Sequence, residues 1–289
     1  MTAGSAPPAP DPGRGRNGWA EGLRKRTISG ALMGVLALAV LRQGDLAFAV
    51  MIAAGAVLMA WEWTRLWSGG RYGVAGGATS GIFLAVVLLA FRDQPGWALA
   101  TCLAGAMLAY AAGRLADAAP RAAWAAFGIC YLGPALVALI WLRGHGSEGE
   151  RTMLWLLLTV VVTDTGAFFA GRLIGGPRLA PRISPKKTWA GLGGAVVASF
   201  ALGLVFASFD PSAPPAATLA LAGASLAVIA QTGDLAESWV KRHFGVKDSS
   251  GLIPGHGGIL DRVDGLVAAA MALALVQWAS AGRLLAWGG

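Results

Sequence analysis

Charged side chains are scarce in this chain. Only 13% of its 289 residues are Asp, Glu, Lys or Arg, whereas soluble domains carry about 25%. Hydrophobic residues make up 56% of the sequence, so too little polar surface remains to cover a water-soluble globule. The composition therefore argues against a soluble all-α protein with a large core and favours a membrane protein.

Cysteine is scarce as well. Cys102 and Cys130 both lie inside apolar runs, and they have neither metal-ligand spacing nor the pattern of a disulfide framework. We interpret both as small buried apolar side chains, which leaves the redox compartment open. A cleaved signal peptide is not expected, because the first apolar run follows a basic cluster and many more runs come after it. Residues 1–26 are predicted to be a disordered, basic N-terminal tail.

Long apolar runs are abundant. A membrane-spanning helix needs about 20 mostly apolar residues. The predicted fold is therefore an all-α polytopic membrane protein with about nine spanning helices, at 27–41, 46–66, 73–91, 97–112, 122–142, 151–174, 189–209, 215–233 and 263–285. We expect N-terminal transmembrane helices over 27–145 and a C-terminal catalytic region over 146–289, with polar loops at 172–188 and 234–262.

The distribution of Lys and Arg predicts the orientation of these helices. If the N-terminus is cytoplasmic and nine segments alternate, all but five of the 23 basic residues lie on the cytoplasmic side; the five are Arg42, Arg92, Arg143, Arg151 and Arg283. Positive residues accumulate in cytoplasmic loops, so both polar loops are expected to face the cytoplasm. The net charge of +8 thus indicates a membrane topology, and no nucleic-acid partner is expected.

One acidic residue stands inside an apolar segment. Asp164 lies in VVTDTGAFFAGR, within the sixth predicted helix. An ionisable residue at membrane depth is costly and is a functional hypothesis by default. The alternative is a structural hydrogen bond with a neighbouring helix, with Thr163 or Thr165 as the donor.

Three further acids stand at the ends of the last two segments. Asp234 ends the eighth segment, whereas Asp261 and Asp264 open the ninth and, three positions apart, share a helix face. If these helices pack together, their carboxylates would repel one another unless a cation lay between them. Mg²⁺ suits such a place, because it takes one or two carboxylates plus substrate phosphates. The alternative is a salt-bridge cluster with Lys241, Arg242 and Arg262.

Hydroxyl and ammonium groups precede the seventh segment. Ser184, Lys186, Lys187 and Thr188 stand just before its start. Such groups near the start of a helix suit phosphate oxygens. A positive anchor on the cytoplasmic side would need the same charge but no particular order, and the sequence leaves both interpretations open.

Residues 238–262 carry the densest group of polar residues. The stretch contains a Pro-Gly turn and His256 flanked by glycines, which allow the backbone to approach a ligand closely. His256 is a candidate phosphate donor or proton carrier, or it only orders the loop. Together these parts favour phosphoryl or nucleotidyl transfer to a membrane lipid. A transporter is disfavoured, because its charges would lie near the midplane within inverted repeats.

The run from Ser238 to Asp264, S-x-V-K-R-x4-K-D-x-S-x-L-x-P-G-H-G-G-x-L-D-R-x-D, closely resembles the signature of phosphatidate cytidylyltransferases, also called CDP-diacylglycerol synthases. The runs DTGAFFAGRxxG from Asp164 and SPKKTW from Ser184 resemble two further blocks of this family, in the expected order. One position departs from the family pattern, since Ala190 stands before Gly191 where a Glu is usual. Either another acid serves in its place or that Glu is not essential, and we take the second view.

This resemblance implies an activity: CTP and phosphatidate react to give CDP-diacylglycerol and pyrophosphate, with Mg²⁺ alone or with a second metal ion. It also implies a homodimer in the inner membrane. An alternative is a related CTP-dependent nucleotidyl- or phosphotransferase acting on another membrane lipid, such as an isoprenoid or ether lipid. Phosphatidate supplies its own nucleophile, because a phosphate monoester with a second pKa of about 6 is largely dianionic at neutral pH.

The resemblance also suggests roles for the candidate residues. We expect Asp234 and Asp261 to bind the metal, with Asp264 as a third ligand. The expected catalytic groups hold the triphosphate or lipid headgroup, stabilise the departing pyrophosphate, or orient the substrate. They are Lys241, Arg242, Asp248, Lys186 and Lys187. The expected substrate-binding residues are Ser184, Thr188, Ser238, Lys247, His256 and Asp164.

Overall fold

The computed structural model describes residues 29–115, 119–253 and 255–288, so the predicted basic tail lies outside the described residues. Eight of the described helices are long and apolar enough to cross a membrane, and a shorter apolar helix, Ser29–Gln43, precedes them. The predicted all-helical, multi-span fold is therefore confirmed. The helices are α2 (Asp45–Ser68), α3 (Gly73–Phe91), α4 (Pro95–Leu115), α5 (Ala119–Arg143), α6 (Gly146–Leu173), α7 (Trp189–Phe209), α8 (Ala216–His243) and α9 (Leu260–Ala279).

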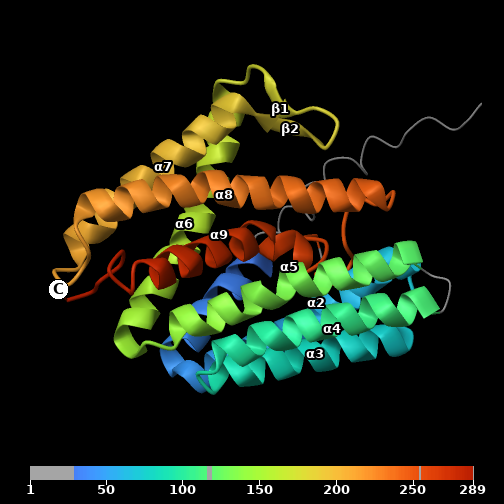
Figure 1. The fold of residues 1–289 in the computed structure, drawn as a ribbon. Helices are drawn as coiled ribbons and strands as arrows, with labels where there is room; N and C mark the ends of the chain where they lie inside the picture. The colour runs from blue at the N-terminus through green and yellow to red at the C-terminus, as the bar shows by residue number, and fades with distance from the viewer. Residues whose placement is uncertain (1–28, 116–118, 254, 289) are drawn as a thin grey trace, which may run out of the picture.

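The helices form two packed groups joined by α9. Helices α2 to α5 pack against one another, α7 packs against both α6 and α8, and α9 contacts α8 on one side and α5 on the other. Figure 1 shows α9 lying between α8 and α5. This packing brings the C-terminal half of α8, the start of α9 and the N-terminal helices to one end of the bundle.

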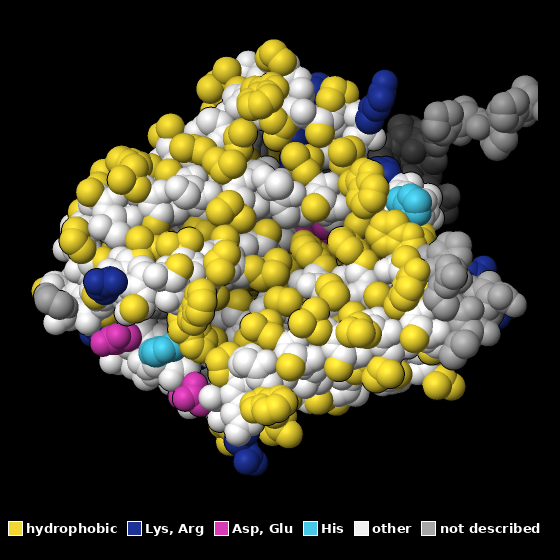
Figure 2. Space-filling model, viewed as in Figure 1, with side chains coloured by type: hydrophobic (Ala, Val, Ile, Leu, Met, Phe, Trp, Pro, Cys, Tyr) yellow, Lys and Arg dark blue, Asp and Glu magenta, His cyan; other side chains and the backbone are white. Residues whose placement is uncertain are grey.

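The surface of the bundle suits a hydrocarbon environment. Many large apolar side chains are exposed, among them Leu103, Phe168 and Val197. The face in Figure 2 is largely apolar, and most of its charged side chains lie near its margins. Exposed apolar area of this extent on a water-soluble chain would favour association, whereas lipid tails accommodate it.

The short first helix contacts both ends of the bundle. At its start, the Ser29 hydroxyl forms a 2.6 Å hydrogen bond with His256 Nδ1. Near its end, the Leu41 carbonyl accepts a 2.9 Å hydrogen bond from Arg143. Arg143 is the last residue of α5 and lies at the other end of the bundle from His256. The helix is therefore directed along the bundle as the spanning helices are, although its described part is only about 22 Å long at 1.5 Å per residue.

Helix α8 extends ten residues beyond the predicted segment. The apolar run ends at Gly233, but Asp234 lies within the helix, which continues to His243. Leu, Ala, Glu, Lys and Arg are good helix formers, so the loss of hydropathy does not end the helix. The predicted polar loop at 234–262 is therefore wrong at both ends, because α9 already begins at Leu260. The true connection, here called the signature loop, spans residues 244–259.

The other predicted loop contains a β-hairpin. Strands β1 (Arg178–Ala180) and β2 (Ser184–Thr188) pair antiparallel between α6 and α7. Gly175 and Gly176, which precede β1, both have positive φ, at 69° and 91°, and this conformation turns the chain sharply after α6. The hairpin is short and rich in Pro and Lys, which explains why its sequence resembles a loop.

Candidate active site

Lys187, on β2 of the hairpin, is linked to α8. Its ammonium group lies 2.6 Å from Asp234 Oδ2 and donates a 2.8 Å hydrogen bond to Gln231 Oε1. The Gln231 amide in turn donates to Asp164 Oδ1 at 3.3 Å, and the Ser238 hydroxyl donates to Asp234 Oδ1 at 3.2 Å. These contacts join the two predicted acids through a residue, Gln231, that the sequence did not single out.

A second network joins α8 to the start of α9. Lys241 is buried, ion-pairs with Glu237 on the same helix and donates a 2.6 Å hydrogen bond to Asp261 Oδ1. Asp261 Oδ2 accepts hydrogen bonds from the amides of Gly258 at 2.7 Å and Ser249 at 2.9 Å. Both oxygens of Asp261 are thus engaged by donors from α8 and the signature loop.

Glu62 connects the N-terminal helices to this network. It lies on α2 and has no exposed surface. Its carboxylate accepts hydrogen bonds from the hydroxyls of Ser249 and Ser250, at 3.0 and 2.6 Å, and from the amides of Ile259 and Leu260, at 2.8 Å each. Glu62 therefore contacts the signature loop at Ser249 and Ser250 and again at the point where the loop joins α9.

The predicted metal ligands are not gathered at one point. Among the residues that the structure describes, no three His, Cys, Asp or Glu side chains lie close enough to hold one ion. Asp261 is engaged by its donors, while Asp264 interacts electrostatically with Asp234 and Asp164. These last three carboxylates, on α9, α8 and α6, are called the acidic group, and two of them, Asp234 and Asp164, belong to the Lys187 network.

This acidic group fits Mg²⁺ in its donor chemistry. Mg²⁺ prefers oxygen ligands and is usually bound through one or two carboxylates together with substrate phosphates. Asp234 and Asp264 supply hard oxygen donors from two helices and interact electrostatically, and oxygens of the substrate phosphates would have to complete the set. Like charges within electrostatic range of one another also favour a cation between them.

The remaining predicted residues lie around these networks. Thr188 is the N-cap of α7, where its hydroxyl accepts a 3.0 Å hydrogen bond from the Gly191 amide. Arg242 is exposed and donates to the Val246 carbonyl at 2.8 Å, and His256 is bonded to Ser29. Ser184 is half-buried on β2, whereas Lys186, Lys247 and Asp248 are exposed.

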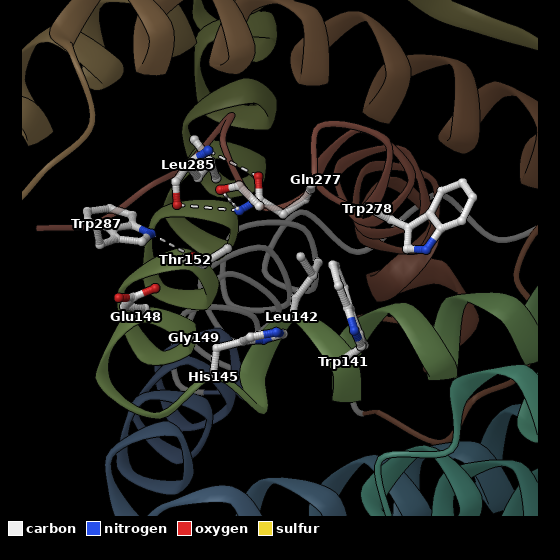
Figure 3. Close-up of a pocket in the computed structure, with 12 residues that line it drawn as sticks. Trp141, Leu142, His145, Glu148, Gly149, Thr152, Gln277, Trp278, Leu285 and Trp287 are labelled. Carbon is white, nitrogen blue, oxygen red and sulfur yellow. Dashed lines mark hydrogen bonds between the residues drawn. The ribbon is translucent and has the colours of Figure 1, made fainter. Parts of the chain in front are cut away.

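A separate cavity lies at the opposite end of the bundle, and none of these residues lines it. It has a volume of about 340 Å³ and is lined by residues from α5, α6 and α9 and from the C-terminal segment. As Figure 3 shows, Trp287 donates a 2.8 Å hydrogen bond to Thr152, and Gln277 bonds the backbone of Leu285. These polar groups fix the C-terminal segment against the bundle.

Comparison with known proteins identifies the family of this chain. The Cytidylyltransferase family profile matches residues 24–279, which is most of the chain. The chain belongs to the Cytidylyltransferase family. Two relatives are named phosphatidate cytidylyltransferase. The one from Brucella suis is 39% identical over 88% of this chain and 92% of its own length. The one from Pseudomonas aeruginosa is 35% identical over 81% of this chain and 88% of its own.

A third relative of the same name, from Staphylococcus epidermidis, is 43% identical over 50% of this chain and 54% of its own length. Membership of the cytidylyltransferase family explains why carboxylates and cationic groups converge at one end of an apolar bundle. It does not by itself explain Glu62 and Gln231, which sequence reasoning missed. The signal for Glu62 was present, since it is an ionisable residue inside an apolar run, as Asp164 is.

Proposed function

We propose that this chain is a phosphatidate cytidylyltransferase, which converts CTP and phosphatidate to CDP-diacylglycerol and pyrophosphate. The observation that carries the proposal is the network of Lys187 with Asp234 and Asp164, near Asp264 at the start of α9, in a cytidylyltransferase whose described residues include eight candidate membrane spans. Cationic and acidic groups at one end of a membrane bundle suit a polyphosphate substrate and a lipid acceptor.

In the proposed reaction, a phosphate oxygen of phosphatidate attacks the α-phosphorus of CTP. A new oxygen–phosphorus bond forms, the bond from the α-phosphorus to the bridging oxygen breaks, and pyrophosphate departs with that oxygen. No protein nucleophile is needed, and no strong base either, because a phosphate monoester has its second pKa at about 6. The task of the protein is to position the two substrates and to neutralise charge.

We assign the basic residues different tasks within this reaction. Lys187, together with the exposed Lys186, neutralises charge on the departing pyrophosphate. Arg242 at the end of α8 and Lys247 in the signature loop are both exposed, and we assign them to contact with the triphosphate. Lys241 is already balanced by Glu237 and Asp261, so we propose that it holds Asp261 and the loop in place.

Asp234 and Asp264 are the residues that would hold Mg²⁺, together with phosphate oxygens of the substrate. When bound, the ion would supply charge neutralisation on the triphosphate. We expect chelation of divalent ions by EDTA to abolish pyrophosphate release, and added Mg²⁺ to restore it. Full activity in excess EDTA would remove the metal from the proposal.

The direct test uses purified protein with radiolabelled CTP and a panel of lipids. We expect label to enter a lipid product with phosphatidate and pyrophosphate to appear in equal amount. The panel also contains an isoprenyl phosphate and an ether lipid, which represent the alternative acceptors. Transfer to one of these but not to phosphatidate would keep the family and overturn the substrate.

We further propose a side of the membrane for the active site and an oligomeric state for the enzyme. The distribution of Lys and Arg supports an active site on the cytoplasmic side of the inner membrane, where CTP is available. The homodimer is implied by the family resemblance, and light scattering of the detergent-solubilised protein tests it. A monomeric mass with full activity would contradict the dimer and leave the reaction unaffected.

A further inference from the structure

Four donors converge on one buried carboxylate far from them in the sequence. Glu62, on α2, accepts two hydroxyl and two amide hydrogen bonds from residues 249–260, with donor–acceptor distances between 2.6 and 3.0 Å. Each of its two oxygens receives two of the four donors, so its acceptor capacity is well used. A carboxylate placed in an apolar bundle at such cost requires an explanation.

The two amide donors belong to the start of α9. Ile259 is the N-cap of this helix and makes no capping bond with its own side chain. Glu62 instead accepts the amides of Ile259 and Leu260, which no turn of α9 can satisfy. A negative charge at this end also interacts favourably with the helix dipole. Glu62 therefore caps α9 from another helix, immediately before Asp261 and Asp264.

The two hydroxyl donors belong to the signature loop. Ser249 Oγ lies 3.0 Å from Glu62 Oε2 and 3.0 Å from Asp261 Oδ2, so a single side chain joins the two carboxylates. Gly258 completes this arrangement, because a Cβ there would overlap both Ser249 and Glu62. The positions of Asp261, and through it Lys241, thus depend on Glu62.

We propose that Glu62 is a positioning residue for the reaction, which fixes the signature loop and the first turn of α9 in their working arrangement. It does not contact substrate in this proposal. Its function is to hold Asp261, and through it Lys241, in a fixed position relative to Lys187 and Asp234. The inference rests on the proposed cytidylyltransferase activity for its kinetic part only.

The test compares Glu62→Gln with Thr64→Val in the full-length protein. Thr64 lies on the same helix, is fully buried and has a hydroxyl without a hydrogen-bond partner among the described residues, which makes it a matched control. For Glu62→Gln we expect kcat to fall at least about tenfold, as small misplacements of reacting groups do, with a smaller change in KM for CTP. Thr64→Val should keep kcat near that of the unchanged protein.

Hydrogen exchange separates positioning from a general structural role. In Glu62→Gln we expect faster amide exchange confined to residues 248–261, with the other helices as protected as before. Faster exchange throughout the bundle would overturn the proposal, and so would an unchanged kcat. If the unchanged protein made no CDP-diacylglycerol, the proposed function would fail, while the exchange measurement would still test the hold of Glu62 on the loop.

A second variant keeps the test sharp if Glu62→Gln does not fold. Ser250→Ala removes one donor to Glu62 and leaves the carboxylate in place. We expect a smaller fall in kcat with the same local rise in exchange, and little further loss when it is combined with Glu62→Gln. Wild-type kcat and exchange in Ser250→Ala, or fully additive losses in the double variant, would contradict positioning through the loop.

Discussion

Gly258 is closely packed within the signature loop. A Cβ at this position would overlap Ser249 and Glu62, whereas a Cβ at Gly251 in the same loop meets nothing within 4 Å. Gly258→Ala should therefore lower the free energy of unfolding by about 1–3 kcal/mol, as overpacking does, and reduce activity as well. Thermal unfolding in detergent checks this. Gly251→Ala is the matched control, and equal losses in both variants would contradict the close packing around Gly258.

Asp234 is the acid that joins the hairpin to α8. Asp234→Asn removes the charge that pairs with Lys187 and one proposed metal ligand. We expect CDP-diacylglycerol formation to fall about 100-fold or more, which is the scale of losing one group from a preorganised site. The exposed Thr232, two residues away, bonds only its own helix at Val228, so Thr232→Val should stay near full activity. A normal rate in Asp234→Asn would refute the role of this acid.

Candidate site residues could be predicted where the neighbouring sequence alone made them unusual. Asp164 and Asp234 stood out because charges interrupt apolar runs, and the structure links them through Gln231 and Lys187. Their partners were not predictable, because Gln231 is uncharged and Glu62 lies almost 190 positions from Ser249. Contacts over such separations depend on which helices pack together, and a single sequence does not contain that information.

At the scale of helices and strands, apolar runs located the spans but not their ends. Helices α3 and α7 begin and end where predicted, since turn residues flank them. Helix α8 does not, because its last ten residues include charged side chains that lower the hydropathy, while half of them are good helix formers. At 28 residues it is about 42 Å long at 1.5 Å per residue. It therefore exceeds the hydrocarbon thickness of about 30 Å, which lets polar residues continue the helix beyond the apolar core.

The contact between α6 and α7 depends on glycine. A Cβ at Gly194 would overlap Ala170 and come within 2.8 Å of the Gly166 carbonyl, whereas a Cβ at the neighbouring Gly193 meets nothing within 4 Å. Small residues allow membrane helices to approach closely, so this packing holds the hairpin between the two helices in place. Gly194→Ala should lower the thermal midpoint and the activity together, while Gly193→Ala should change neither. Thermal scans of both variants in one detergent decide between these outcomes.

The whole molecule places its chemistry at one end, and the sequence predicted which side of the membrane that end faces. Lys247 in the signature loop and Glu148 in the first turn of α6 are both exposed, and they lie near opposite ends of the bundle. The direction of the first helix, from His256 toward Arg143, agrees with an odd number of crossings. If the N-terminus is cytoplasmic, the signature loop faces the cytoplasm as well.

Cysteine labelling tests this orientation. Cys102 is buried and Cys130 is exposed, so Cys130→Ala gives a background with little reaction, into which Lys247→Cys or Glu148→Cys is introduced. An impermeant maleimide should label Lys247→Cys only in inside-out vesicles and Glu148→Cys only in spheroplasts. The reverse pattern would separate the signature loop from cytoplasmic CTP, and the proposed reaction could not then occur on that side. Labelling of both positions from one side would contradict the arrangement of the bundle itself.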